Sequence, residues 1–99
     1  MILEYIRYQV SDAQAFTDAY ARAQASLDAS PQCLAYELSR CTEDETFFTL
    51  RIEWDSLAGH LEGFRKSPEF GPFLAAIRPF IGEIQEMRHY EVTAMSRRK

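Results

Sequence analysis

Trp54 and His60 are the side chains whose types and spacing best suit chemistry on a small molecule. Trp54 ends a strand-like run, and His60 follows in a segment of helical periodicity that continues to Phe64. Because histidine titrates near neutral pH, His60 can polarise or deprotonate a phenolic substrate held against Trp54. A structural interpretation is also open, in which Trp54 plugs the core and His60 is a core or rim histidine.

His89 is a second candidate, in the last strand-like run, where Arg88 and Tyr90 flank it. Arg and Tyr on a strand are more typical of a surface or of contacts between subunits. Arg51 and Glu53 share a strand face, so we expect salt bridges from them across such a contact. The chain contains no Gly-rich phosphate loop, G-x-S-x-G elbow or H-E-x-x-H motif, so no motif by itself indicates an enzyme.

The composition is that of a folded domain with no nucleic-acid or membrane partner. Of the 99 residues 46% are hydrophobic, and the net charge is −4. Nucleic-acid affinity comes mostly from clustered basic residues, and the one such cluster is terminal, Arg97, Arg98 and Lys99. The N-terminal stretch has neither a basic leader nor a long apolar run, which predicts no signal peptide or membrane span and a cytoplasmic location. We expect one domain over residues 1–95 and a basic tail at 96–99.

Hydrophobic periodicity divides the chain into strands and helices. The predicted elements are strand 2–10, a helix from Ser11 to Ser30, strands 33–41 and 46–54, a helical segment from Asp55-Ser56, a helix at 72–78 and strand 83–93. In the first strand Glu4 interrupts the apolar face. The long helix is expected to begin with a capping box at Ser11. Leu57, Leu61 and Phe64 form the predicted apolar side of the next helical segment.

The element order predicts an α+β fold of the ferredoxin-like βαββαβ type, a four-stranded antiparallel sheet with helices on one face. The opposite face is expected to carry Phe47, Tyr5 or Tyr8, and Met87 or His89. Such a face is too apolar for water and too polar for a monomer core. We therefore predict a homodimer that packs through this sheet face, with two-fold symmetry.

Residues 51–81 resemble the antibiotic biosynthesis monooxygenase (ABM) superfamily of dimeric α+β barrels. The family pattern is a strand that ends in Trp, a helix with an aromatic residue or His, and then S-P-x-F-x-x-F. The matching residues are Trp54, His60 and Ser67-Pro68-Glu69-Phe70 with Phe73. The order of strands and helices extends the resemblance over residues 2–93.

The resemblance implies a cofactor-independent monooxygenase that oxidises a small aromatic molecule, a phenol or quinol, with O2. The best understood members use no metal or flavin, so no cofactor and no metal site are expected. Trp54 and His60 are the implied catalytic residues. The implied substrate-binding residues are Leu50, Phe64, Phe73 and Leu74. Leu50 stands where those monooxygenases have an Asn, on the same strand face as the Trp.

Two other functions are compared with this one. A haem-degrading branch of the superfamily needs a His after the S-x-x-F segment, where this chain has Phe73 and Leu74, so haem is not expected. The alternative from a different class is a non-catalytic dimeric α+β barrel that binds a small apolar molecule. The monooxygenase predicts that His60 and Trp54 both line an accessible cavity, whereas the binding protein predicts that His60 faces solvent or a fixed structural partner.

Overall fold

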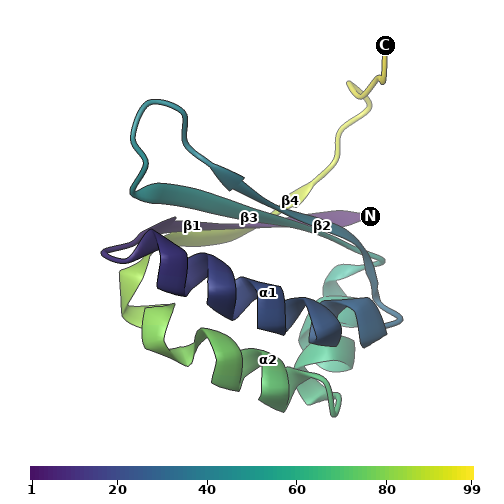
Figure 1. Cartoon of the computed structure of the whole chain (residues 1–99). Coiled ribbons are helices and arrows are strands. Elements are labelled where there is room, and N and C mark those ends of the chain that lie inside the picture. The colour runs from purple at the N-terminus through teal and green to yellow at the C-terminus, as the bar shows by residue number, and fades with distance from the viewer.

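A computed structural model describes residues 1–99 and has two layers, a sheet and a layer of helices on one of its faces (Figure 1). The elements are β1 (Ile2–Gln9), α1 (Ala13–Ala29), β2 (Cys33–Arg40), β3 (Phe47–Trp54), α2 (Phe70–Ile77) and β4 (Ile84–Glu91). The sheet has four strands in the order β2-β3-β1-β4, and every neighbouring pair is antiparallel. The predicted ferredoxin-like α+β fold is therefore confirmed.

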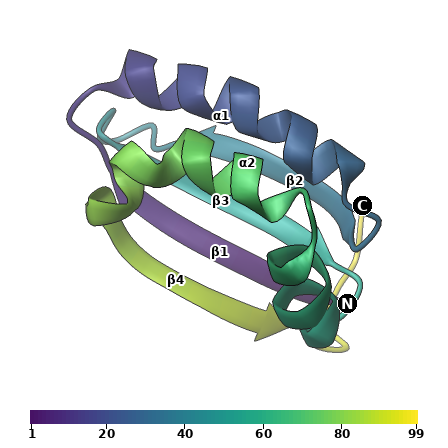
Figure 2. The ribbon, with the colours of Figure 1, turned by 90° about the horizontal axis from the view of Figure 1, so that it is seen from below.

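The helices cover the sheet unevenly (Figure 2). The two α-helices run side by side, α1 on the β2 side and α2 nearer β1, and short helical turns between β3 and α2 cover one end of the sheet. β4 is an edge strand with most of its residues exposed. None of the helices combines the length and the hydropathy that a membrane span requires.

The core lies between the helical layer and the sheet. One stripe of α1 faces it, since Phe16, Tyr20, Ala23 and Leu27 are all buried. Alternate residues of β3, from Phe48 to Trp54, are buried beneath the helices. This alternation is the period of two that a strand with one covered face requires.

The cap of α1 differs from the predicted capping box at Ser11. Asp12 is the N-cap, and its Oδ1 accepts the Ala15 N–H at 3.0 Å. The Ser11 N–H instead donates to Glu83 Oε2 at 2.9 Å, ahead of the last strand. An Asp cap fits this position equally well, because its short carboxylate reaches a free N–H of the first turn.

The segment after β3 also turns differently from the prediction. Ser56 Oγ accepts the Gly59 N–H at 2.8 Å, and a π-helical turn follows over Gly59–Gly63. The Phe64 N–H bonds to the carbonyls of Gly59 and His60, so this turn is wider than an α-helical one. As a result His60 and Phe64 face the sheet, whereas Leu57 is 43% exposed and does not belong to the packed side.

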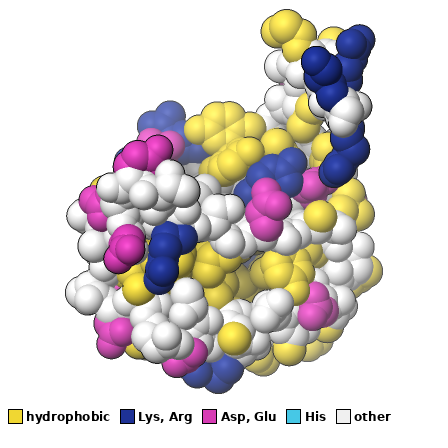
Figure 3. All heavy atoms as spheres, turned by 45° about the horizontal axis from the view of Figure 1, so that its top comes forward, with side chains coloured by type: hydrophobic (Ala, Val, Ile, Leu, Met, Phe, Trp, Pro, Cys, Tyr) yellow, Lys and Arg dark blue, Asp and Glu magenta, His cyan; other side chains and the backbone are white.

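The sheet face without helices carries Tyr5, Phe47, Arg51 and Tyr90. The rings of Tyr5 and Tyr90 meet edge to face, with centroids 5.5 Å apart. Arg51 bonds to Glu53 of the same strand at 2.8 Å. In Figure 3 apolar side chains gather around charged ones on the upper part of the molecule, beside the projecting C-terminal segment.

Three of the expectations for this face need correction. Tyr8 is buried in the core. Successive side chains of β1 point to opposite faces of the sheet, and Tyr8 points to the helix side whereas Arg7 points to the other. Met87 and His89 are paired with Ile6 and Glu4 in the β1–β4 register, so they share the helix side of the sheet. The periodicity of a single strand does not show which of its two faces is covered by helices. The pairing of β4 with β1 determines it.

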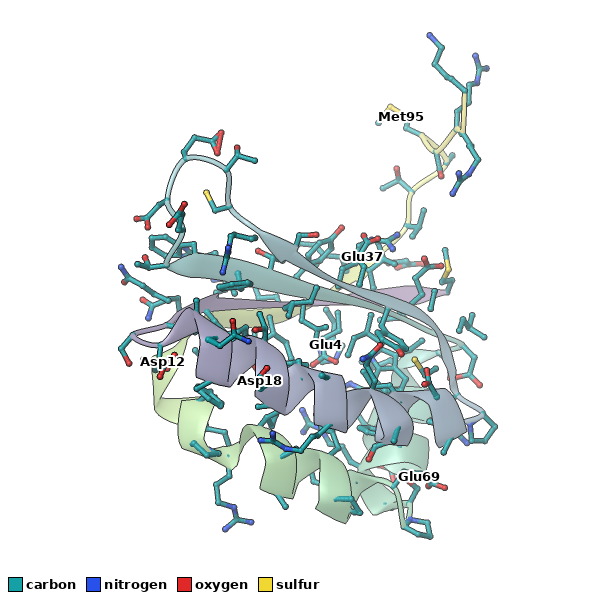
Figure 4. The ribbon with its side chains drawn as sticks, viewed as in Figure 1. Glu4, Asp12, Asp18, Glu37, Glu69 and Met95 are labelled. Carbon is teal, nitrogen blue, oxygen red and sulfur yellow. The ribbon has the colours of Figure 1, made fainter.

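The chain beyond β4 has no regular secondary structure. Met95 points away from the two layers and is 91% exposed (Figure 4). The basic residues predicted as a tail follow it.

Candidate active site

A cavity of about 570 Å³ lies between the sheet and the α2 side of the helical layer. Its volume falls within the range of small-molecule sites. Residues of β1, β3 and β4 form one wall, and α2 with the turns before and after it forms the other. Most lining side chains are hydrophobic, and Glu4, His60, Arg65 and Lys66 are the charged or titratable ones.

Trp54 and His60 stack on one another in the wall of this cavity. Their ring centroids are 4.5 Å apart and their planes differ by 15°. Trp54 is the last residue of β3, and the π-helical turn brings His60 back over it. The structure thus brings together Trp54 and His60, the two residues proposed from the sequence as catalytic candidates.

Glu4 is the residue of this site that the sequence analysis missed. It is 2% exposed and lies between the sheet and the helices (Figure 4). Its Oε1 accepts the Trp54 Nε1–H at 3.0 Å and lies 3.4 Å from His60 Nε2. A lone carboxylate on the apolar face of a strand was the available signal, because a buried charge is rare unless it is paired.

His89 completes the cluster from the edge strand. It is directly opposite Glu4 in the β1–β4 pairing, with its Nε2 3.9 Å from Glu4 Oε2. The same Nε2 lies 2.7 Å from His60 Nδ1. One imidazole therefore donates to the other, and the two tautomers exchange the roles of donor and acceptor.

Burial governs the charges in this cluster. It raises the pKa of the Glu4 carboxyl, a rise that the Trp54 N–H and the charge of Arg65 partly offset. It also lowers the pKa of His60 to about 4, with smaller contributions from Arg65 and His89. The pKa of His89 is lowered by burial and by Arg65. Both imidazoles are thus neutral near pH 7, and the contact between Glu4 and His60 is not an ion pair there.

Five of the six predicted site residues line the cavity, namely Trp54, His60, Phe64, Phe73 and Leu74. Leu50 does not. It is buried in the core and borders a separate groove between α1 and β2. Leu50 is on the same strand face as Trp54, but it lies under α1 rather than beside the cavity. The sequence does not show which helix covers which part of the strand, so this difference was not predictable.

The arrangement can hold a flat apolar ring and accept a proton from it. When Nδ1 of neutral His60 donates to His89, the lone pair of the ring lies on Nε2, so His60 can act as a base there without first losing a proton. Glu4, His60 and His89 also place one ligand atom each within 4.8 Å of one another, the spacing of a possible metal site.

Fold and cavity together define a class, the small ferredoxin-like α+β proteins with an apolar site between sheet and helices. Residues 1–76 match the family model described as antibiotic biosynthesis monooxygenase. The chain belongs to this family, which confirms the resemblance found in the sequence.

Individual relatives agree with this membership. The uncharacterised protein YczJ of Bacillus subtilis is 30% identical over 78 residues, which cover 79% of this chain and 82% of YczJ. A structure from Bordetella bronchiseptica, assigned to the antibiotic biosynthesis monooxygenases, superposes with a TM-score of 0.80 at 21% identity, over 93% of this chain and 96% of that one. SnoaB from Streptomyces nogalater, a cofactor-independent oxygenase, gives 0.74 at 18% identity, over 97% and 94%. At these identities the two structures show the shared fold.

Proposed function

We propose that this protein is a monooxygenase that oxidises a small phenol or quinol with O2 and without a metal or flavin. The observation that carries the proposal is the stacked Trp54–His60 pair in the wall of an apolar cavity. Family membership supports it, and so does the shared fold of SnoaB, itself a cofactor-independent oxygenase.

In the proposed reaction the substrate ring lies in the cavity beside Trp54, against Phe64 and Phe73. In the tautomer in which His60 Nδ1 donates to His89 Nε2, the lone pair on His60 Nε2 takes the proton of the ring hydroxyl. The resulting phenolate is electron-rich and adds through a ring carbon to O2, which forms a ring-bound hydroperoxide. Loss of water from this hydroperoxide breaks the O–O bond and the C–H bond at that carbon, so the substrate supplies all four electrons. One oxygen atom forms a C=O bond at a ring carbon, and the other leaves as water with the two hydrogens that the substrate loses.

Glu4 and His89 position His60 in this proposal. The contact of 2.7 Å between His60 Nδ1 and His89 Nε2 orients the ring and lets a proton pass between the two imidazoles. The buried Glu4 carboxylate lies next to the imidazolium that forms during the reaction and stabilises its charge. Removing either side chain is expected to reduce kcat more than it changes KM.

We also propose that the protein works as a homodimer through the sheet face that lacks helices. Tyr5, Phe47 and Tyr90 lie on this face, and Tyr90 is 45% exposed. A second copy packed on it by a two-fold axis removes these rings from water. The cavity lies on the other side of the sheet, so dimerisation leaves it accessible.

A non-catalytic binding protein is the second candidate. It is favoured by the closed hydrogen bonding of the cluster, in which Trp54, Glu4, His60 and His89 already contact one another. A purely structural histidine has contacts of this kind. In that case the cavity binds an apolar molecule, and His60 contributes stability only.

Oxygen uptake by the purified protein, measured with a panel of quinols and polyphenols, separates the two candidates. The variants are His60→Gln and, as a matched control, Glu62→Gln, which changes an exposed side chain of the same turn. We expect uptake in wild type and control, and a loss of about 10²–10⁴-fold in His60→Gln. Uptake that is absent with every compound overturns the monooxygenase in favour of the binding protein, and uptake that is unaffected by His60→Gln overturns the role of His60 as the base.

A further inference from the structure

Glu4, His60 and His89 form a carboxylate and two imidazoles that converge beside the cavity, and Glu4 and His60 line it. We propose that these three side chains bind a divalent transition-metal ion of the Zn²⁺ or Co²⁺ type, and that the bound ion blocks the oxygenase reaction. The binding site stands on the structure alone. The blocking effect rests on the proposed function, because it concerns the role of His60 as a base.

The donor types favour such an ion. Imidazole nitrogens suit Zn²⁺, Co²⁺ and Ni²⁺, whereas Mg²⁺ and Ca²⁺ prefer sites made of oxygen atoms alone. Each imidazole in its neutral form carries one lone pair that can bind such an ion. The third ligand, Glu4, supplies a negative charge that is otherwise buried without a cation in direct contact. A bound cation therefore compensates a charge that the fold places in an apolar environment.

The distances are close to those of a metal site. Metal–ligand bonds of 2.0–2.1 Å in tetrahedral geometry place two ligand atoms about 3.3 Å apart. His60 Nδ1 and His89 Nε2 are 2.7 Å apart, and His89 Nε2 and Glu4 Oε2 are 3.9 Å apart. These two pairs each need a change of about 0.6 Å to meet that geometry, and the third pair, His60 with Glu4, lies within 4.8 Å. Small side-chain rotations supply a change of this size, and half-buried His89 on the edge strand has room for it.

The surroundings of Glu4 also fit. The Trp54 Nε1–H holds Oε1 at 3.0 Å, which leaves Oε2 free to act as the ligand. A hydrogen bond to the second oxygen of a ligating carboxylate is a usual feature of metal sites, since it fixes the orientation of the ligand. Three protein ligands leave a fourth position open towards the cavity, where a water molecule or a substrate oxygen can bind.

Metal binding and the base function of His60 exclude each other. A neutral imidazole has a single lone pair, and an ion that takes it leaves none for the proton of the substrate. The ion thus converts His60 from a base into a ligand. We expect the protein to lose oxygenase activity when one ion is bound per chain and to regain it when a chelator removes the ion.

The test begins with binding, which needs no substrate. Chelator-treated full-length protein is titrated with ZnCl2 by calorimetry and with CoCl2 by visible absorption. We expect one ion per chain with micromolar or tighter affinity, and the d–d bands of tetrahedral or five-coordinate Co²⁺. Glu4→Gln and His89→Ala should each weaken binding by about 10–100-fold or more, whereas Glu62→Gln should bind as wild type does.

Circular dichroism of each variant verifies that its fold is retained, and Glu4→Gln preserves the shape of the side chain in any case. Absence of a saturable Co²⁺ spectrum, or equal affinity in all variants, overturns the metal site. If Co²⁺ binds but oxygen uptake is unchanged, the blocking effect is overturned. If no quinol is oxidised by any form of the protein, the proposed function fails, while the binding data still decide the metal site.

Discussion

The indole N–H of Trp54 donates to the Glu4 carboxylate at 3.0 Å, and both side chains are buried. The register partner of Trp54 on β1 is Ile2, so this bond runs diagonally between the strands. It ties a buried charge to the ring that forms the wall of the cavity.

Replacing Glu4 by Gln should stabilise the protein near neutral pH. Burial raises the pKa of Glu4, so its stabilising contribution is complete below the ordinary value of 4.5 and is lost as the pH rises through the folded-state pKa. Glutamine has no such loss and keeps an oxygen for the Trp54 N–H. We expect a gain of about 0.5–2 kcal/mol in the free energy of unfolding at pH 7.5, the usual size for a stabilising substitution.

Urea unfolding of wild type and Glu4→Gln at pH 4, 6 and 7.5 measures this gain. Glu45→Gln is the control, because Glu45 is an exposed residue of the β2–β3 loop. The advantage of Glu4→Gln should increase with pH. An advantage that is constant across this range contradicts a raised pKa for Glu4.

His60 should give the opposite pH dependence. Its folded-state pKa of about 4 lies below the ordinary value of 6.5, so the unfolded chain binds a proton more readily. Stability from this group is therefore complete above about pH 6.5 and is lost as the pH falls towards 4. The loss should amount to about 1–3 kcal/mol.

Unfolding free energies of wild type and His60→Gln between pH 7 and pH 4.5 test this dependence. The variant should show a shallower decline, because it lacks the titration of His60. Parallel curves for the two proteins indicate that His60 is as solvated as an ordinary histidine.

Substitutions at Leu50 and Leu74 should have different effects, the first mainly on stability and the second mainly on substrate binding. Leu50 is buried in the core away from the cavity, so Leu50→Ala should lower the free energy of unfolding by about 2–5 kcal/mol and leave KM nearly unchanged. Leu74 is half-buried and lines the cavity, so Leu74→Ala should raise KM with a smaller loss of stability. Denaturation curves and steady-state kinetics of both variants give the comparison. A raised KM in Leu50→Ala alone refutes this placement of the substrate.

The uncovered sheet face should control the oligomeric state. Tyr90 meets Tyr5 at its surface, and Tyr90→Glu places a charge where the second copy is proposed to pack. Sedimentation should show a dimer for wild type and a monomer for Tyr90→Glu. Met95→Glu is the control, because Met95 projects away from the sheet. A dimer that survives Tyr90→Glu points to an interface elsewhere.

The fold was predictable because its signals are local. The apolar residues of α1 recur at helical spacing and those of β3 alternate, and in both elements these residues are buried. Trp54 and His60 were found in the same way, by residue type and spacing.

The remainder of the site depends on contacts that no local pattern contains. Glu4 and His89 meet through the pairing of the first and last strands. Leu57 was expected on the packed side with Leu61 and Phe64, because a π-helical turn is indistinguishable from an α-helix by apolar spacing, and in the structure it is exposed. The placement of Leu50 depends on which helix lies above it.

The most direct test of the proposed oxygenase is the fate of the two atoms of O2. Wild type and His60→Gln are incubated under ¹⁸O2 with the quinol that is consumed fastest, and the product is analysed by mass spectrometry. The account predicts one ¹⁸O atom per molecule of product in wild type and almost no labelled product in His60→Gln. Product without the label, or labelled product formed equally by His60→Gln, contradicts it.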